Sequence, residues 1–246
     1  MFIKKIMIIA IETSSNNLSL TLLNKEHVIK NISVPFKNEL SEIIVPAINK
    51  FLKDNSIIFD HVSFLAVGCG PGSFTGIRSV ISAALGVKIS HNHIKSIGIN
   101  SLAGLTMSVL DEAKKLNLNY IISSIDSKRG DSFLQLFKVN YNECGGLPFS
   151  IASDINTSKI EDLLQYISTT KIIPKDIYFV GHQSKLAKKL VWDINTAKKF
   201  EQNPNSLYIA KIASLVIKNN IESDNSIFMY NKFKPIYAQL PLINLS

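Results

Sequence analysis

The chain has 246 residues, a length that allows one large domain or two lobes. Its hydrophobic share of 46% is ample for a buried core, and no apolar run reaches the roughly 18 residues that a membrane span needs. The net charge of +8 is only a weak indication of an anionic partner, because the many Lys, Asn and Ile residues indicate a compositional bias. The apolar start of the chain runs directly into Glu12, where a cleaved signal peptide needs small residues, so we expect a cytoplasmic protein.

The first part of the chain predicts three strands followed by alternating helices and strands. Residues 6–11 form a continuous apolar run, and residues 18–23 and 28–34 alternate between apolar and polar. Apolar residues then recur at helical spacing over residues 38–53, with Pro46 inside this helix. A fourth strand at 61–69 and a second helix at 73–90 complete the unit.

The second part predicts a similar but less complete unit. Its expected helices and strands lie, in chain order, at residues 102–116, 120–125, 133–139, 160–167, 177–180 and 207–218. A strand-strand-strand-helix-strand-helix order is the unit of the actin-like, ribonuclease H-like α/β fold, which uses two copies. We therefore predict a first lobe at residues 1–100 and a trimmed second lobe at 101–246. The helix at 206–218 is expected to pack back on the first lobe.

A glycine-rich loop links the fourth strand to the second helix. Glycine tolerates positive φ and a close neighbour, and Ser or Thr can cap the helix that follows. The loop matches neither a Walker A motif nor G-x-G-x-x-G in register. Two interpretations stay open, namely a phosphate cradle at a helix N-terminus and a tight junction between strand and helix. The residues concerned are Gly70, Gly72, Ser73, Thr75, Gly76 and Arg78.

Two polar turns are further candidates. Glu12, Thr13 and Ser14 follow the first strand, where an acid could hold hydrated Mg²⁺ and hydroxyls could donate to phosphate, unless the turn is an ordinary polar hairpin. The turn at residues 126–131 begins and ends with aspartates, and Arg129 between them would neutralise a hairpin cap formed by Asp126. Arg78 and Arg129 are the only arginines of the chain, so their positions are expected to need a guanidinium.

No catalytic or metal-binding residue is predicted. His91 and His93 have no nearby acid or cysteine that would complete a metal site, and no nucleophile with an adjacent base is recognisable. Cys69 and Cys144 do not form a disulfide or metal pattern. The turn at residues 180–182 has a single glycine followed by His182, which argues against a full adenosine pocket.

Five segments resemble the TsaB family, in the right order and over nearly the whole chain. The most specific is G-P-G-S-F-T-G-I-R at residues 70–78. The others are I-E-T-S at 11–14, I-G-I-N-S-L at 97–102, S-I-D-S-K-R-G-D at 124–131 and P-I-Y at 235–237. Three departures from the family pattern are Leu40 before Ser41 where a His is frequent, Cys69 where Arg is frequent, and Glu12 where Asp is common.

The resemblance implies a non-catalytic subunit of the complex that forms N6-threonylcarbamoyladenosine at position 37 of tRNA. Such a subunit binds and activates TsaD, joins TsaE in the assembled complex, meets tRNA indirectly and can form a homodimer. It has no cofactor of its own, and ATP or ADP would bind at the assembled complex. The implied partner surface lies on the two helices of the first lobe and comprises Ile43, Ile44, Ile48, Phe51, Phe74, Ile77 and Ile81.

Two other functions are weighed against this one. Glu12 and the glycine loop also suit an independent actin-like ATP-dependent kinase of small molecules. A peptidase is suggested only by a label that relatives of TsaD have carried, and the chain has no recognisable activated nucleophile or water.

Overall fold

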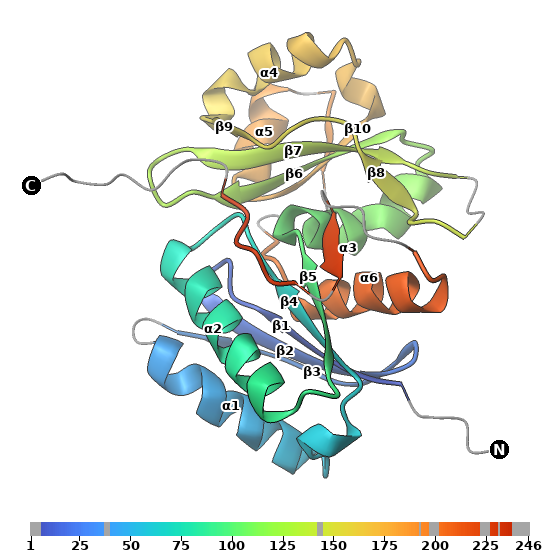
Figure 1. Ribbon diagram of the computed structural model, residues 1–246. Helices are drawn as coiled ribbons and strands as arrows, with labels where there is room; N and C mark the ends of the chain where they lie inside the picture. Colours follow the sequence, from blue (N-terminus) through green and yellow to red (C-terminus); the bar gives the residue numbers. More distant parts are fainter. Residues whose placement is uncertain are drawn as a thin grey trace, which may run out of the picture.

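The computed structural model describes residues 6–36, 40–141, 145–191, 193–196, 202–221, 227–230 and 232–237. This part of the chain forms two six-stranded sheets with helices in three layers around them (Figure 1). Two helices cover the outer face of the first sheet, two lie between the sheets, and two cover the outer face of the second (Figure 1). Each of the three helix layers packs in its own apolar cluster, so the hydrophobic core is divided into three parts.

The first sheet has the strand order β12-β5-β4-β1-β2-β3. β1, β2 and β3 are antiparallel, β4 and β5 run parallel to β1, and β12 is antiparallel to β5. Its strands are β1 (Met7–Glu12), β2 (Asn17–Asn24), β3 (His27–Pro35), β4 (Phe64–Gly68), β5 (Lys95–Ile99) and β12 (Phe228–Tyr230).

The second sheet repeats this arrangement with the order β11-β10-β6-β7-β8, and β9 pairs with β7. β6, β7 and β8 are antiparallel, whereas β10 and β11 run parallel to β6. Its strands are β6 (Tyr120–Asp126), β7 (Ser132–Val139), β8 (Phe149–Ile151), β9 (Asn156–Ser158), β10 (Ile177–Gly181) and β11 (Asn195–Thr196). Two copies of one strand order confirm the predicted actin-like fold, and the short β8 and β11 agree with a trimmed second copy.

Six helices accompany the sheets in the described residues: α1 (Leu40–Asp54), α2 (Phe74–Ser90), α3 (Ser101–Lys115), α4 (Leu163–Thr170), α5 (Ser184–Leu190) and α6 (Ser206–Lys218). The predicted elements are found with small shifts at their ends, while positions 38 and 39 of the first predicted helix lie outside the described residues. The predicted strand at 61–69 begins only at Phe64, because a short 3₁₀ turn takes Phe59–His61. None of the described helices is both long and apolar enough to cross a bilayer.

β1 shows why a continuous apolar run forms a strand here. Ile8 and Ala10 face the layer of α3 and α6, whereas Met7, Ile9 and Ile11 face α1 and α2. Successive side chains of a strand point to opposite faces, so a strand covered on both faces needs apolar residues throughout.

α6 returns from the second sheet to pack against β1 and β2 of the first. A buried hydroxyl cluster fixes its start, since Ser206 Oγ lies 2.8 Å from Ser19 Oγ and 2.7 Å from Thr21 Oγ1. Asn205 caps the helix by accepting the Leu207 N–H at 2.8 Å. With β12 added to β5, the described residues from 206 to 230 belong spatially with the first sheet.

Candidate functional site

The segments that follow the carboxyl ends of β1, β4, β6 and β10 line cavities between the two lobes. In open α/β sheets, ligands bind at the carboxyl ends of the strands. Two cavities lie there, of about 280 Å³ and about 300 Å³. The first is lined by both polar turns, and the second by the glycine loop, residues 127–129 and residues 236–237. This cleft is therefore the candidate ligand site of the fold.

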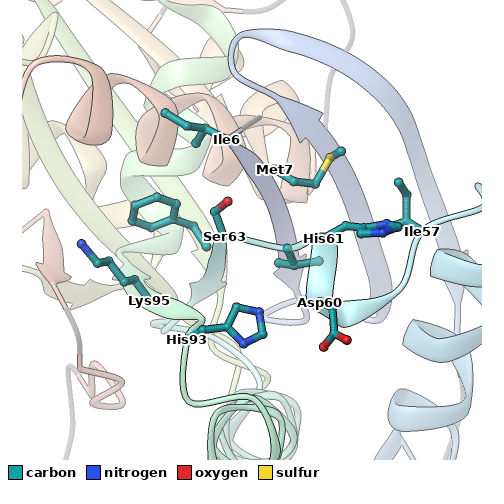
Figure 2. Close-up of a pocket in the computed structure, with 10 residues that line it drawn as sticks. Ile6, Met7, Ile57, Asp60, His61, Ser63, His93 and Lys95 are labelled. Carbon is teal, nitrogen blue, oxygen red and sulfur yellow. The ribbon is translucent and has the colours of Figure 1, made fainter. Parts of the chain in front are cut away.

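A larger cavity of about 590 Å³ lies at the other end of the first sheet, beside the amino ends of β1 and β4 (Figure 2). Asp60, His61 and His93 line it, but the described residues contain no group of three His, Cys, Asp or Glu side chains that could hold a metal. The cavity borders Ile6, and residues 1–5 lie outside the described part of the chain. This cavity is not the candidate site, because the polar turns after β1 and β6 and the glycine loop line the two cavities between the lobes.

Glu12 is completely buried at the end of β1. Its two carboxyl oxygens accept the backbone N–H of Ser14 at 2.6 Å and the hydroxyl of Ser101 at 2.8 Å. Burial raises the pKa of the Glu12 carboxyl above its ordinary value, although these hydrogen bonds oppose the shift. A side chain at Gly68 would place its Cβ 2.0 Å from the Glu12 carboxyl, so it would displace that carboxyl from its present position.

The three predicted phosphate-binding residues therefore have different surroundings. Glu12 joins the start of α3 to the first sheet, and the Thr13 hydroxyl donates to the Gly76 carbonyl at 2.9 Å inside the protein. This burial argues against a contact of either group with phosphate, because both groups hold helices in place. Of the three residues, Ser14 lines the 280 Å³ cavity, and its side chain also hydrogen-bonds the Glu12 carboxyl and opposes the rise in the pKa of Glu12.

The glycine loop packs directly on the β1–β2 turn. Gly70 and Gly72 have φ of 95° and 149°, and the Ser73 N–H donates to the Ser14 carbonyl at 2.8 Å. A Cβ on Gly72 would lie 2.4 Å from that carbonyl oxygen. Ser73 also caps α2 by accepting the Gly76 N–H at 3.2 Å, as one of the two predicted caps. Of the two open interpretations, this geometry favours the tight junction between strand and helix.

Arg78 holds the end of the described chain against the start of α2. Its Nε donates to the Tyr237 hydroxyl at 3.0 Å, and its guanidinium lies 3.9 Å from the centre of the Phe74 ring. The Ile236 N–H donates to the Cys69 carbonyl at 2.8 Å. Burial raises the pKa of the Cys69 thiol to about 12, so this cysteine is unreactive. Tyr237 was not predicted as the partner of Arg78, because no local pattern joins such distant positions.

The turn between β6 and β7 is organised by Lys128. Asp126 accepts its backbone N–H at 2.8 Å and its ammonium group at 2.9 Å, and His182 Nε2 lies 3.9 Å from the same carboxylate. Although burial works in the opposite direction, these donors lower the pKa of Asp126. Arg129 is exposed and lines the 300 Å³ cavity. Sequence analysis singled out Arg129 but not Lys128, although the two residues are adjacent.

The residues of the predicted partner surface are divided between the core and the exposed face of the helices. Most of its members are core residues with at most 6% exposure, because one side of each helix packs on the first sheet; these are Ile44, Ile48, Phe51, Ile77 and Ile81. Ile43 and Phe74 are each 41% exposed. The outer faces also carry Val45, Leu85 and Ile89, of which Ile89 is 85% exposed. The helical spacing of apolar residues in the sequence did not distinguish the core-facing side of α1 and α2 from their exposed side.

The fold and the closed glycine loop define an actin-like protein whose polar turns face a narrow interlobe cleft. The family model described as "TsaD: tRNA N6-adenosine threonylcarbamoyltransferase" matches residues 34–232. The match covers most of the chain, and the chain belongs to this family.

Individual proteins of known name agree with this assignment. The chain is 27% identical over 194 residues to the tRNA threonylcarbamoyladenosine biosynthesis protein TsaB of Bacillus subtilis, covering 78% of each chain. It is 26% identical over 235 residues to TsaB of Buchnera aphidicola subsp. Baizongia pistaciae, covering 94% of this chain and 96% of that protein. The solved structure of YeaZ from Pseudomonas aeruginosa has a TM-score of 0.67 at 15% identity, covering 94% of this chain and 99% of that one. The resemblance to the TsaB family is thus confirmed.

Proposed function

We propose that this chain is a non-catalytic partner subunit in the formation of N6-threonylcarbamoyladenosine at position 37 of tRNA, and that it binds and activates TsaD. Relatives named as threonylcarbamoyladenosine biosynthesis proteins support the pathway. In this proposal TsaE joins the assembled complex, where ATP or ADP would bind, and tRNA is met indirectly. The chain alone would form a homodimer.

The surroundings of the polar turns support a role without catalysis. Glu12, the acid nearest to the cleft on β1, is enclosed by protein and occupied by Ser14 and Ser101. The backbone at Gly72 packs directly against Ser14 of the β1–β2 turn. This contact leaves no space for a phosphate between the loop and the turn, where the kinase alternative would need one. A group that cannot reach a substrate cannot activate a nucleophile or hold a transferred phosphoryl group.

The observation that carries the proposal is the apolar outer face of α1 and α2. Phe74, Leu85 and Ile89 lie along one side of α2 and are exposed. A Cβ on Gly86 would meet no atom within 4 Å, so the helix presents bare backbone beside Leu85. Large exposed apolar side chains beside small residues suit close packing against a helix of another subunit, where apolar burial contributes about 25 cal/mol per Å².

The test uses charges placed on this face. Leu85→Glu and Ile89→Glu should each weaken binding to the cognate TsaD at least tenfold, because a carboxylate would be buried without a partner. Both residues are exposed, so thermal stability should stay within about 2 °C of the wild type. Isothermal titration and co-elution on a sizing column measure the binding to TsaD, and a thermal melt measures the stability.

A matched control keeps this test specific. Ile173 is a half-exposed apolar residue of the second lobe, so Ile173→Glu adds the same charge away from α1 and α2 and should leave TsaD binding unchanged. If the Leu85→Glu, Ile89→Glu double variant still binds TsaD with wild-type affinity, the placement of the interface is wrong. If depletion of the protein leaves the modified nucleoside in tRNA at its normal level by mass spectrometry, the pathway assignment is wrong.

The homodimer would use the same face. Sedimentation of the isolated wild-type chain should then show a concentration-dependent dimer, and the double variant should remain a monomer. A dimer that persists in the double variant would place the self-association elsewhere.

A further inference from the structure

A cavity of about 510 Å³ lies between the first sheet and the end of α6, on the face of the sheet opposite to α1 and α2. Its walls are mostly apolar or aromatic and consist of Phe64, Val216, Ile217, Ile221 and Tyr230. The other lining residues are Lys95 and Asn220. Small-molecule sites have volumes of about 300–1,000 Å³ and combine apolar walls with a few polar groups, so this cavity has the size and the lining of a ligand site.

Two aromatic rings and one ammonium group form the side of the cavity that belongs to the sheet. The rings of Phe64 and Tyr230 pack edge to face, with their centres 6.5 Å apart. Lys95 is the neighbour of Phe64 in the parallel register of β4 and β5, so both side chains lie on the same face of the sheet. Lys95 Nζ lies 6.0 Å from the centre of the Phe64 ring. This contact with the ring holds a positive charge at the wall of an apolar cavity.

The charge of Lys95 has no counter-charge in the described part of the chain. No carboxylate of these residues lies within ion-pair distance of Lys95, whereas the nearby Lys218 pairs with Glu26 at 2.6 Å. None of the described residues that line the cavity is acidic. Asp60 shares the neighbouring 590 Å³ cavity with Lys95, but Figure 2 shows the two side chains on opposite sides of it. The ammonium group is therefore available to a carboxylate from outside the chain.

The end of α6 also leaves the cavity open to an anion. The last carbonyl groups of a helix carry partial negative charge, which would repel an anion if they were free. Two of them accept backbone N–H groups here, since Val216 O accepts the Ile221 N–H at 3.1 Å and Ile217 O accepts the Asn220 N–H at 3.4 Å. The Asn220 amide and the Tyr230 hydroxyl add hydrogen-bond donors to the lining.

We propose that this cavity binds a small hydrophobic carboxylate, that is, a short aliphatic chain that ends in one carboxyl group. The chain lies against Phe64, Ile217 and Ile221, and the carboxylate pairs with the Lys95 ammonium. One ammonium balances one carboxylate, whereas a dianion such as phosphate would keep an uncompensated charge beside apolar walls. The bound molecule joins the end of α6 to β5 and β12. The site is separate from the proposed partner surface on α1 and α2, and it involves no covalent step.

Isothermal titration of the full chain with sodium hexanoate tests the binding. Hexanoate should bind saturably, whereas hexan-1-ol, which lacks the charge, and acetate, which lacks the chain, should each bind at least about tenfold more weakly. Butanoate should also bind about tenfold more weakly, because each buried methylene contributes about a factor of four. At one hundred times its dissociation constant, hexanoate should raise the melting temperature by about 5–10 °C. Absence of saturable hexanoate binding, or equal binding of hexan-1-ol, would overturn the proposal.

Variants test the placement of the site. Lys95→Met removes the ammonium but keeps an unbranched side chain beside Phe64, so it should weaken hexanoate binding at least about tenfold and leave hexan-1-ol binding unchanged. Ile221→Trp should weaken the binding of both molecules, because the larger side chain fills the cavity. Lys30→Met is the matched control, since Lys30 is exposed on β3 and does not line the cavity, and this variant should bind hexanoate like the wild type. If Lys95→Met also binds hexanoate like the wild type, Lys95 is not the counter-charge and the proposal fails.

Discussion

The contact between the glycine loop and the β1–β2 turn leads to a sharp prediction for Gly72→Ala. Gly72 has φ of 149°, a conformation that other L-residues rarely adopt. The added Cβ would lie 2.4 Å from Ser14 O and 2.6 Å from Ser14 Cβ. Ser14 O also accepts the Ser73 N–H, so neither side can move away without disturbing that hydrogen bond.

The expected loss of stability is the sum of a backbone cost and a packing cost. A residue in a disfavoured region of φ and ψ costs about 1–3 kcal/mol, and an overpacked contact costs about 1–3 kcal/mol. Together they predict a free energy of unfolding lower by about 2–6 kcal/mol. For a chain of this length, each kcal/mol corresponds to about 2–4 °C, so the melting temperature should fall by about 4–24 °C.

Gly86→Ala is the matched control in the same segment of the chain. A Cβ on Gly86 meets no atom within 4 Å, and the residue lies inside α2. Alanine is favoured over glycine in a helix by about 0.5–1 kcal/mol, so this variant should melt at or above the wild-type temperature. Circular dichroism with heating, and urea titration, measure both variants. A Gly72→Ala protein that melts within 2 °C of the wild type would refute the packing argument.

Three further variants test the other contacts. Phe51→Ala should lower the free energy of unfolding by about 3–5 kcal/mol in a urea titration, because the ring is buried against the first sheet, and wild-type stability would contradict that burial. Arg78→Ala and Tyr237→Phe should show a coupling of about 0.5–1 kcal/mol in a double-mutant cycle, whereas additive effects would mean that their hydrogen bond contributes nothing. Glu12→Gln tests a pH effect: burial raises the pKa of Glu12 above 4.5, so its stabilising contribution is present below pH 4.5 and is lost as the pH rises through the folded-state pKa. The Gln variant should show a smaller decline in stability over that pH range, and an unchanged profile in urea titrations would contradict the assignment.

Much of the fold could be predicted because its elements have strong local patterns. The continuous apolar run of β1 reflects burial on both faces, and the alternation of β2 and β3 marks strands that form hairpins. β5 was missed because Lys95, Ser96 and Gly98 interrupt its pattern, and its pairing with β4 makes it a strand. β12 was missed because it is only three residues long, and it forms a strand by pairing with β5.

The candidate site was less predictable, because its contacts join distant parts of the chain. Ser73 was predicted as a cap from its position before α2, and the cap is a local interaction. No local pattern indicates that Arg78 meets Tyr237, or that Ser124 shares a cavity with Ser14. The run of hydroxyls after β1 was recognised, but only the packing shows which of them are used inside the protein.

The glycine loop connects the cleft, the helix surface and the end of the described chain. Its Ser73 N–H is bound to the β1–β2 turn, its Ser73 hydroxyl caps α2, and the Cys69 carbonyl before it holds Ile236. The orientation of α2 is therefore set by contacts at the carboxyl ends of the strands. A catalytic cleft would need this loop to be free to meet a substrate, whereas a helix that presents a surface to another protein needs it to be fixed. The close approach of Gly72 to Ser14 meets the second requirement, so the same glycines that first suggested a phosphate cradle argue for a rigid support beneath the proposed partner surface.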